Sequence, residues 1–151
     1  MPERDYLLMA IDLARKNVLE RGGRPFGAVL VRSGEVLATG VNDVLATNDP
    51  SKHAELEAIR AAAIALGNPR LEGCVIYASG HPCPMCLAAM HLTGIEAVYY
   101  AYSNADAEKY GLSSARVYAE MTRPPERQSI KFEQLPVRDA GEHPYEIWRR
   151  R

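Results

Sequence analysis

The stretch Cys74–Met90, "CVIYASGHPCPMCLAAM", decides how the chain is expected to fold. Its first six residues are a short apolar run typical of a buried strand. A turn at Gly80-His81-Pro82 follows, and a helix is expected from about Pro84, because proline suits the first turn of a helix. The sequence therefore predicts a strand that leads directly into a helix, with Cys83 and Cys86 at the start of that helix.

The residues before this stretch predict two helices and a hairpin. Apolar residues at helical spacing predict a helix over 5–21, and glycines end it. Residues 26–43 read as two strands joined by a turn at Ser33-Gly34. The polar loop 45–52 then leads to a helix that starts near His53 and ends at Gly67. The apolar positions of the first helix are Leu7, Ile11, Ala14 and Val18, and those of the second are Leu56, Ile59, Ala63 and Leu66.

The residues after the stretch predict one further strand over 96–102, short helical pieces within 106–121, a strand over 129–137 and a last helix from about Asp139. Strands that alternate with helices after an opening hairpin indicate an α/β fold of three layers, α-β-α. Its central mixed sheet is expected to have five strands. The length of 151 residues fits a single domain.

Composition excludes several classes of function. The 18 Lys and Arg residues balance 19 Asp and Glu residues, which gives no basic surface for nucleic acid or an anionic membrane. Arg149–Arg151 read as a solvated tail. The N-terminal segment resembles neither a signal peptide nor a membrane span, so a cytoplasmic protein is expected. Three cysteines without a secretory signal argue against a disulfide framework and leave thiols available for a metal.

Two predicted helix starts carry residues that suit a catalytic metal. His53 and Glu55 flank Ala54 in one first turn, and Cys83 and Cys86 are three residues apart in the other. One nitrogen and two sulfur ligands suit zinc, and a catalytic zinc keeps its fourth position open for water. The positive end of a helix dipole favours the thiolate form of cysteine, which is the form that binds metal.

Glu55 is then close to the metal without being a ligand. A carboxylate in that position can take a proton from a zinc-bound water and deliver it again. His-x-Glu followed by Pro-Cys-x-x-Cys is the pattern of zinc-dependent base deaminases. Two other readings of the cysteines stay open. A redox pair would leave the His-x-Glu half unused, and a closed structural zinc site would need a fourth ligand from His81, Cys74 or His91.

The chain resembles the cytidine deaminase superfamily, and within it most closely the bacterial guanine deaminases. The resemblance rests on "RPFGAVLV", "TNDPSKHAE", "GCVIYAS", "PCPMCLAAM", "AVYYA" and the tail "HPYEIWRRR". It implies one zinc ion per subunit, bound by His53, Cys83 and Cys86, and proton transfer by Glu55. It also implies that Asn42 hydrogen-bonds the substrate ring, that Phe26 stacks on it, and that Ala54 contacts it.

The implied reaction is hydrolytic deamination of a free nucleobase or similar amino-heterocycle, with guanine as the first candidate. A zinc hydroxide attacks the amidine carbon, and ammonia leaves. Other candidates are cytosine, isocytosine, an aminotriazine or a creatinine-like ring, a tRNA adenosine, and, from another class, a non-catalytic zinc-stabilised binding module. Three positions differ from the guanine deaminases: Gly80-His81 replaces a cysteine-glutamate pair, Leu92 replaces an aromatic residue, and Ser113-Ser114 replaces two aspartates. His81 and Ser114 are therefore expected to influence substrate choice.

The resemblance also gives the C-terminal helix a role. Residues 139–151 are expected to close the active site as a lid, and in guanine deaminases this segment can come from the partner subunit, which implies a domain-swapped homodimer. Tyr145 and Trp148 would cover the base. Glu142 or Glu146 could accept hydrogen bonds from adjacent ring donors, as a carboxylate can.

Overall fold

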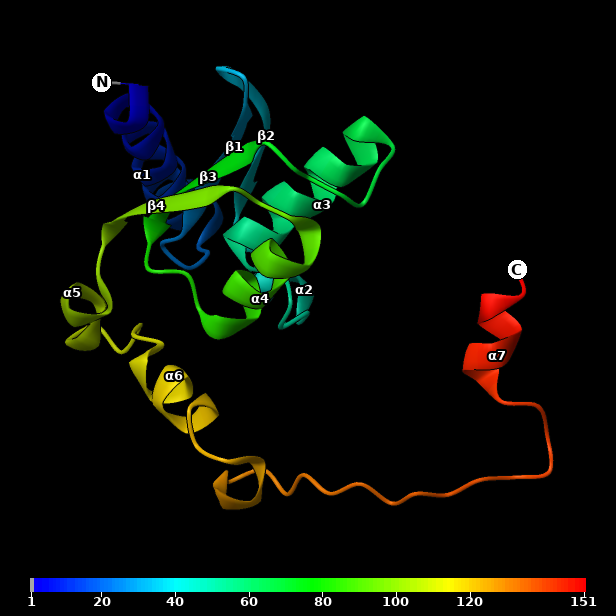
Figure 1. Ribbon diagram of the computed structural model, residues 1–151. Coiled ribbons are helices and arrows are strands. Elements are labelled where there is room, and N and C mark those ends of the chain that lie inside the picture. The colour runs from blue at the N-terminus through cyan, green and yellow to red at the C-terminus, as the bar shows by residue number, and fades with distance from the viewer. Residues whose placement is uncertain (1) are drawn as a thin grey trace. The chain divides into compact units, whose positions relative to one another are not determined.

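The computed structural model describes residues 2–151 (Figure 1). The chain divides into a first compact unit that runs to Ala119 and a second unit, Glu120–Arg151. The first unit contains the sheet and the helices predicted to carry the metal site. Each unit is described by itself below.

The first unit is built on a four-stranded mixed sheet. Its strands are β1 (Gly27–Arg32), β2 (Glu35–Val41), β3 (Cys74–Gly80) and β4 (Ala97–Tyr102), in the order β2-β1-β3-β4. β1 pairs antiparallel with both β2 and β3, whereas β3 and β4 are parallel. The predicted hairpin is confirmed, and its turn places Ser33 and Gly34 at positive φ.

Helix α1 (Pro2–Arg21) covers one face of the sheet (Figure 1). Its Ala10 packs against Val29, Val31 and Tyr77, which point to this face because side chains alternate along a strand. The buried positions of α1 are Ala10, Ala14 and Asn17. The predicted apolar stripe was therefore partly wrong, because Val18 is exposed and the polar Asn17 is buried.

The opposite face is covered by α3 (Ala54–Leu66) and α4 (Pro84–Thr93), which complete the three layers (Figure 1). The row Ala54, Ala58 and Ala62 is fully buried and lets α3 approach the sheet closely. Gly40 on β2 makes the same approach possible, since a Cβ there would lie 2.2 Å from the carbonyl oxygen of Ala54. The fold thus fixes the start of α3 by direct contact with β2.

Short elements connect these layers. The polar loop after β2 contains a helix that the sequence did not predict, α2 (Val44–Thr47). After β4 come α5 (Asn104–Glu108) and α6 (Ala115–Met121), which agree with the helical pieces predicted for 106–121. Among residues 2–151, no helix is both long and apolar enough to cross a membrane.

The second unit has little regular structure. It contains a 3-10 turn, η1 (Pro125–Arg127), and α7 (Pro144–Arg149), so the last helix is shorter than the predicted 139–151. Residues 129–137 form no strand, and the sheet therefore has four strands rather than the predicted five. Their apolar side chains Ile130, Phe132, Leu135 and Val137 are exposed. The alternating pattern is that of a strand, but a strand needs a hydrogen-bonded neighbour.

Candidate metal centre and active-site cavity

His53 is delivered by a closed loop at the start of α3. Asp43 N–H donates to the Lys52 carbonyl oxygen at 2.9 Å, which closes the loop that begins after β2. His53 caps α3 in an extended conformation, and its side chain makes no capping hydrogen bond. The imidazole ring is therefore available to face the neighbouring helix start.

Cys83 and Cys86 lie at the equivalent place on α4. Cys83 is the N-cap residue, its side chain also makes no capping bond, and Pro84 occupies the first turn. Cys86 is fully buried, whereas Cys83 is half-buried. The Tyr118 hydroxyl donates to the carbonyl oxygen of Pro82, which ties α6 to the residue before Cys83.

The three side chains converge at distances that fit one zinc ion. The Cys83 and Cys86 sulfurs lie 3.6 Å apart, and His53 Nδ1 lies 3.4 Å and 3.6 Å from them. With tetrahedral zinc bonds of usual length, the expected separations are about 3.8 Å between sulfurs and about 3.6 Å between nitrogen and sulfur. His53, Cys83 and Cys86 thus form the zinc-binding site predicted from the sequence.

Among residues 2–151, no fourth histidine, cysteine or carboxylate joins this group. Cys74 is buried in the core at the opposite end of β3, and His91 is exposed near the end of α4. A closed structural zinc site would need such a ligand. Three ligands leave the fourth position open, which is the arrangement of a catalytic zinc.

The two thiols form a coupled pair. Hydrogen bonding with Cys86, supported by His53, lowers the pKa of the Cys83 thiol to about 4. Hydrogen bonding with Cys83, together with burial, raises the pKa of Cys86. The thiolate form of Cys83 is therefore favoured, and the thiolate is the form of cysteine that binds a metal.

Glu55 lies in the first turn of α3 beside this site and is 6% exposed. Burial raises the pKa of its carboxyl above the ordinary value, and a hydrogen bond with Cys86 acts in the opposite direction. Glu55 is not part of the ligand group. A buried carboxyl beside the open coordination position is suited to accept and return a proton.

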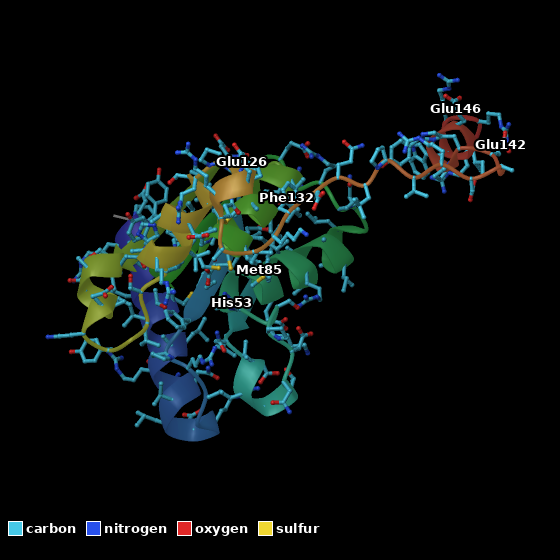
Figure 2. The ribbon with its side chains drawn as sticks, turned by 90° about the horizontal axis from the view of Figure 1, so that it is seen from below. His53, Met85, Glu126, Phe132, Glu142 and Glu146 are labelled. Carbon is cyan, nitrogen blue, oxygen red and sulfur yellow. The ribbon has the colours of Figure 1, made fainter. Side chains whose placement is uncertain are left out.

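A cavity of about 450 Å³ is lined by two of the three ligands, His53 and Cys83, and by Glu55, and we call it the zinc cavity. His53, which precedes α3, and Met85, in the first turn of α4, are two of its lining residues and are labelled in Figure 2. Five residues that the sequence predicted to contact substrate line it: Phe26, Asn42, Ala54, His81 and Ser114. The structure thus brings them together with the zinc ligands, while their contact with substrate stays a prediction.

Two of these residues have clear local geometry. Asn42 is 4% exposed, and its Oδ1 accepts a hydrogen bond from Val44 N–H at 3.2 Å. No hydrogen bond to its Nδ2 is found within residues 2–151, so this amide can donate into the cavity. The ring of Phe26 lies against Gly80, where a Cβ would be 3.2 Å from the ring.

Two further lining residues, His81 and Ser114, are each fixed by neighbours. The His81 ring packs between Tyr100 and Tyr118, with centroids 4.7 Å and 5.4 Å away. Ser114 donates to Asn104 Oδ1 through its backbone N–H at 3.0 Å and its hydroxyl at 3.3 Å.

The sequence analysis missed several lining residues, among them Arg24, Met85, Leu112 and Val117. Arg24 could have been noticed, since it begins the segment "RPFGA" that contains Phe26. Met85 lies between Cys83 and Cys86 on α4, so its place beside the site could also have been noticed. Leu112, in a loop, and Val117, on α6, reach the cavity by packing that has no local signal.

The four lid candidates belong to the second unit. Glu142 precedes α7 and forms an ion pair with Arg150, and Glu146, on α7, forms one with Arg149 (Figure 2). Tyr145 and Trp148 are 78% and 64% exposed. Their role as a lid stays a prediction.

Comparison with known proteins agrees with this geometry. Residues 2–102 match the model of the cytidine and deoxycytidylate deaminase zinc-binding region. A guanine deaminase of Bacillus subtilis is 40% identical over 151 residues, covering 99% of this chain and 95% of the relative. A tRNA-specific adenosine deaminase of Aquifex aeolicus is 34% identical, covering 92% of this chain and 89% of the relative. The X-ray structure of the Bacillus subtilis guanine deaminase superimposes with a TM-score of 0.88 over 97% of this chain and 93% of that one.

Proposed function

This chain belongs to the cytidine and deoxycytidylate deaminase family and is a zinc-dependent deaminase, and from that premise we propose that it converts free guanine to xanthine and ammonia. The observation that carries the proposal is the similarity to a guanine deaminase along the whole chain. That similarity extends past the zinc-binding region into the C-terminal residues.

The zinc site would supply the nucleophile of the reaction. When bound, zinc lowers the pKa of a water molecule toward about 7, so that a nucleophile is available at neutral pH. Among this chain's residues, Glu55 would take the proton that the water loses. It would then give a proton to the ring nitrogen next to the attacked carbon and, in a second transfer, to the departing amine. The overall reaction adds one water and releases one ammonia.

The remaining residues of the zinc cavity would orient the base. Phe26 would stack on the ring, and Ala54 would contact its edge next to Glu55. The Asn42 Nδ2 would donate to a ring nitrogen or carbonyl. Ser114 and His81 also line the cavity, and they would contact the edge that distinguishes one base from another.

We further propose that residues 139–151 close the zinc cavity, in the same chain or in a partner subunit. α7 carries exposed apolar side chains, Tyr145, Ile147 and Trp148, that would gain from burial on a base. In the first unit, β4 is an edge strand with exposed Tyr99, Tyr100 and Tyr102. An uncovered edge with such side chains is a ready site for strand pairing, and residues 129–137 of a second copy have the matching pattern. A homodimer with exchanged C-terminal segments follows from this pairing.

A second candidate substrate is a tRNA adenosine, because a tRNA-specific adenosine deaminase is similar over 92% of this chain. Binding to an RNA stem would require a basic surface, and the net charge of -1 argues against it. Small amino-heterocycles such as cytosine, isocytosine, creatinine or an aminotriazine would require only a different fit beside Ser114 and His81.

The test measures ammonia release by the zinc-loaded protein from each candidate substrate. The substrates are guanine, adenine, cytosine, isocytosine, creatinine, an aminotriazine and a tRNA anticodon stem-loop. Guanine is expected to give the highest kcat/KM. A higher value for another ring would overturn the choice of substrate while leaving the deaminase chemistry intact. Activity on the stem-loop alone would establish the second candidate.

A further inference from the structure

Asn17 is a polar residue at a position where the α1 helix would be expected to bury an apolar one. It is 2% exposed and continues the buried row of Ala10 and Ala14. Its amide oxygen makes no hydrogen bond within residues 2–151. Burial of an amide is unfavourable unless its hydrogen bonds are satisfied. The hydrogen bonds that its nitrogen donates must therefore offset the cost of leaving the oxygen unpaired.

Both hydrogens of the Asn17 amide are used to fix backbone carbonyls. Nδ2 donates to the carbonyl oxygen of Arg24 and to that of Asn42, each at 2.8 Å. Arg24 lies just before β1 and Asn42 just after β2, and both line the zinc cavity. One side chain on α1 therefore connects two separate segments of the cavity wall.

These bonds determine what Asn42 offers to a substrate. Its carbonyl oxygen is bound by Asn17, and its backbone N–H donates to the Phe26 carbonyl oxygen at 3.2 Å. Its side-chain Oδ1 accepts from Val44. Every other polar group of Asn42 is thus engaged, and only Nδ2 remains to donate into the cavity.

Gly23 shows how closely the structure fits the Asn17 amide. A Cβ at residue 23 would lie 2.5 Å from Asn17 Nδ2, which is too close for two unbonded atoms. The backbone of Gly23 is not in the left-handed region, and the three atoms nearest to a Cβ there all belong to the Asn17 side chain, so this side chain is the main source of strain for alanine. Gly23 therefore leaves room for the amide in this orientation.

We propose that Asn17 is a positioning residue for substrate recognition: it fixes the Arg24 and Asn42 segments relative to each other and thereby aims Asn42 Nδ2 and Phe26 at the bound base. This inference rests on the proposed function of the zinc cavity as a base-binding site. Asn17 does not itself line that cavity, and the zinc ligands come from other elements. Its loss should affect substrate binding more than metal binding or chemistry.

The experiment compares wild type, Asn17→Ala, Gly23→Ala and the double variant, with guanine as substrate. One misaligned hydrogen bond changes affinity by roughly tenfold, so KM should rise about tenfold in each single variant while kcat changes much less. Zinc should remain at one ion per chain. Because Gly23→Ala acts through Asn17, it should add little in the Asn17→Ala background. Val29→Ala is the matched control, since it empties part of the same α1 face and should lower Tm without changing KM.

A second readout is independent of turnover. Amide hydrogen exchange should become faster at Phe26, at Gly27 and at residues 42–44 in Asn17→Ala, but not in Val29→Ala. A folded Asn17→Ala variant with unchanged KM and unchanged amide exchange would overturn the inference. The inference would also be overturned if Gly23→Ala raised KM by the same factor in wild type and in the Asn17→Ala background. If wild type is inactive on guanine, the proposed function fails, and the exchange comparison alone decides the role of Asn17.

Discussion

Gly40→Ala should weaken the metal site indirectly, because residue 40 is neither one of the zinc ligands nor part of the lining of the zinc cavity. The added Cβ would lie 2.2 Å from the Ala54 carbonyl oxygen, 2.8 Å from Ala58 N and 2.9 Å from Glu57 Cβ. A carbon–oxygen contact needs about 3.3 Å, so the start of α3 must retreat by about 1 Å. Two of the three atoms belong to the backbone, and no rotamer change can relieve the contact.

The consequence follows from what α3 carries. Metal sites tolerate ligand displacements of about 0.2 Å, so a 1 Å retreat of His53 should weaken zinc binding by at least tenfold. Overpacking of this kind costs about 1–3 kcal/mol, which lowers Tm by roughly 3–10 °C for a chain of this size. Glu55 moves with His53, so kcat should also fall.

Gly27→Ala is the matched control. Its Cβ would lie 2.4 Å from the Ala10 carbonyl oxygen, an equally tight contact, but with α1 on the other face of the sheet. Both variants should lower Tm in circular-dichroism melts. Only Gly40→Ala should lose zinc to a competing chromophoric chelator at lower chelator concentration. Equal zinc affinity in the two folded variants would refute the reasoning that the β2–α3 contact positions His53.

Three further outcomes are expected. Removing zinc with a chelator should lower the free energy of unfolding, because the metal site exists only in the folded chain. The expected loss is about 2.7 kcal/mol relative to protein at a free zinc concentration 100-fold above Kd. Scanning calorimetry measures this loss, and an unchanged Tm would contradict it. Ser114→Asp should raise kcat/KM for guanine relative to cytosine, because a carboxylate accepts from two donors; an unchanged ratio would mean that residue 114 does not face the base. If the C-terminal segments are exchanged between subunits, mixing the Glu55→Gln and Trp148→Ala proteins should restore about a quarter of wild-type activity. About half of the dimers are then mixed, and one of the two sites in each mixed dimer is intact. No restoration would argue for a lid within the same chain.

The metal site could be predicted from the sequence because its signals are local. A helix start fixes where its first side chains point, and the two helix starts carry ligand types that suit one zinc ion, which predicted His53, Cys83 and Cys86 as its ligands. The same holds for the hairpin, where Ser33-Gly34 lies between two apolar runs. The sequence could not show how close the two helix starts lie.

The two structural predictions that were wrong, a strand over 129–137 and a buried Val18, have a common physical reason. Residues 129–137 alternate like a strand, but the pattern describes only the chain's own side chains and not whether a hydrogen-bonded neighbour exists. Helical spacing on α1 predicted Val18 to be buried, whereas Asn17 takes the buried position because two carbonyls need its amide. Such pairings join residues 7 and 25 positions apart and leave no trace in periodicity.

The measurement that tests the central claim most directly is ammonia and xanthine formation from guanine by zinc-loaded wild type and Glu55→Gln, with zinc content determined for both. The account predicts one zinc per chain in each protein and turnover in wild type only, because the proposed proton transfer needs the Glu55 carboxylate, whereas Glu55 is not part of the ligand group. Wild-type turnover by Glu55→Gln would contradict the proton-transfer role. Loss of zinc in that variant would contradict the three-ligand site.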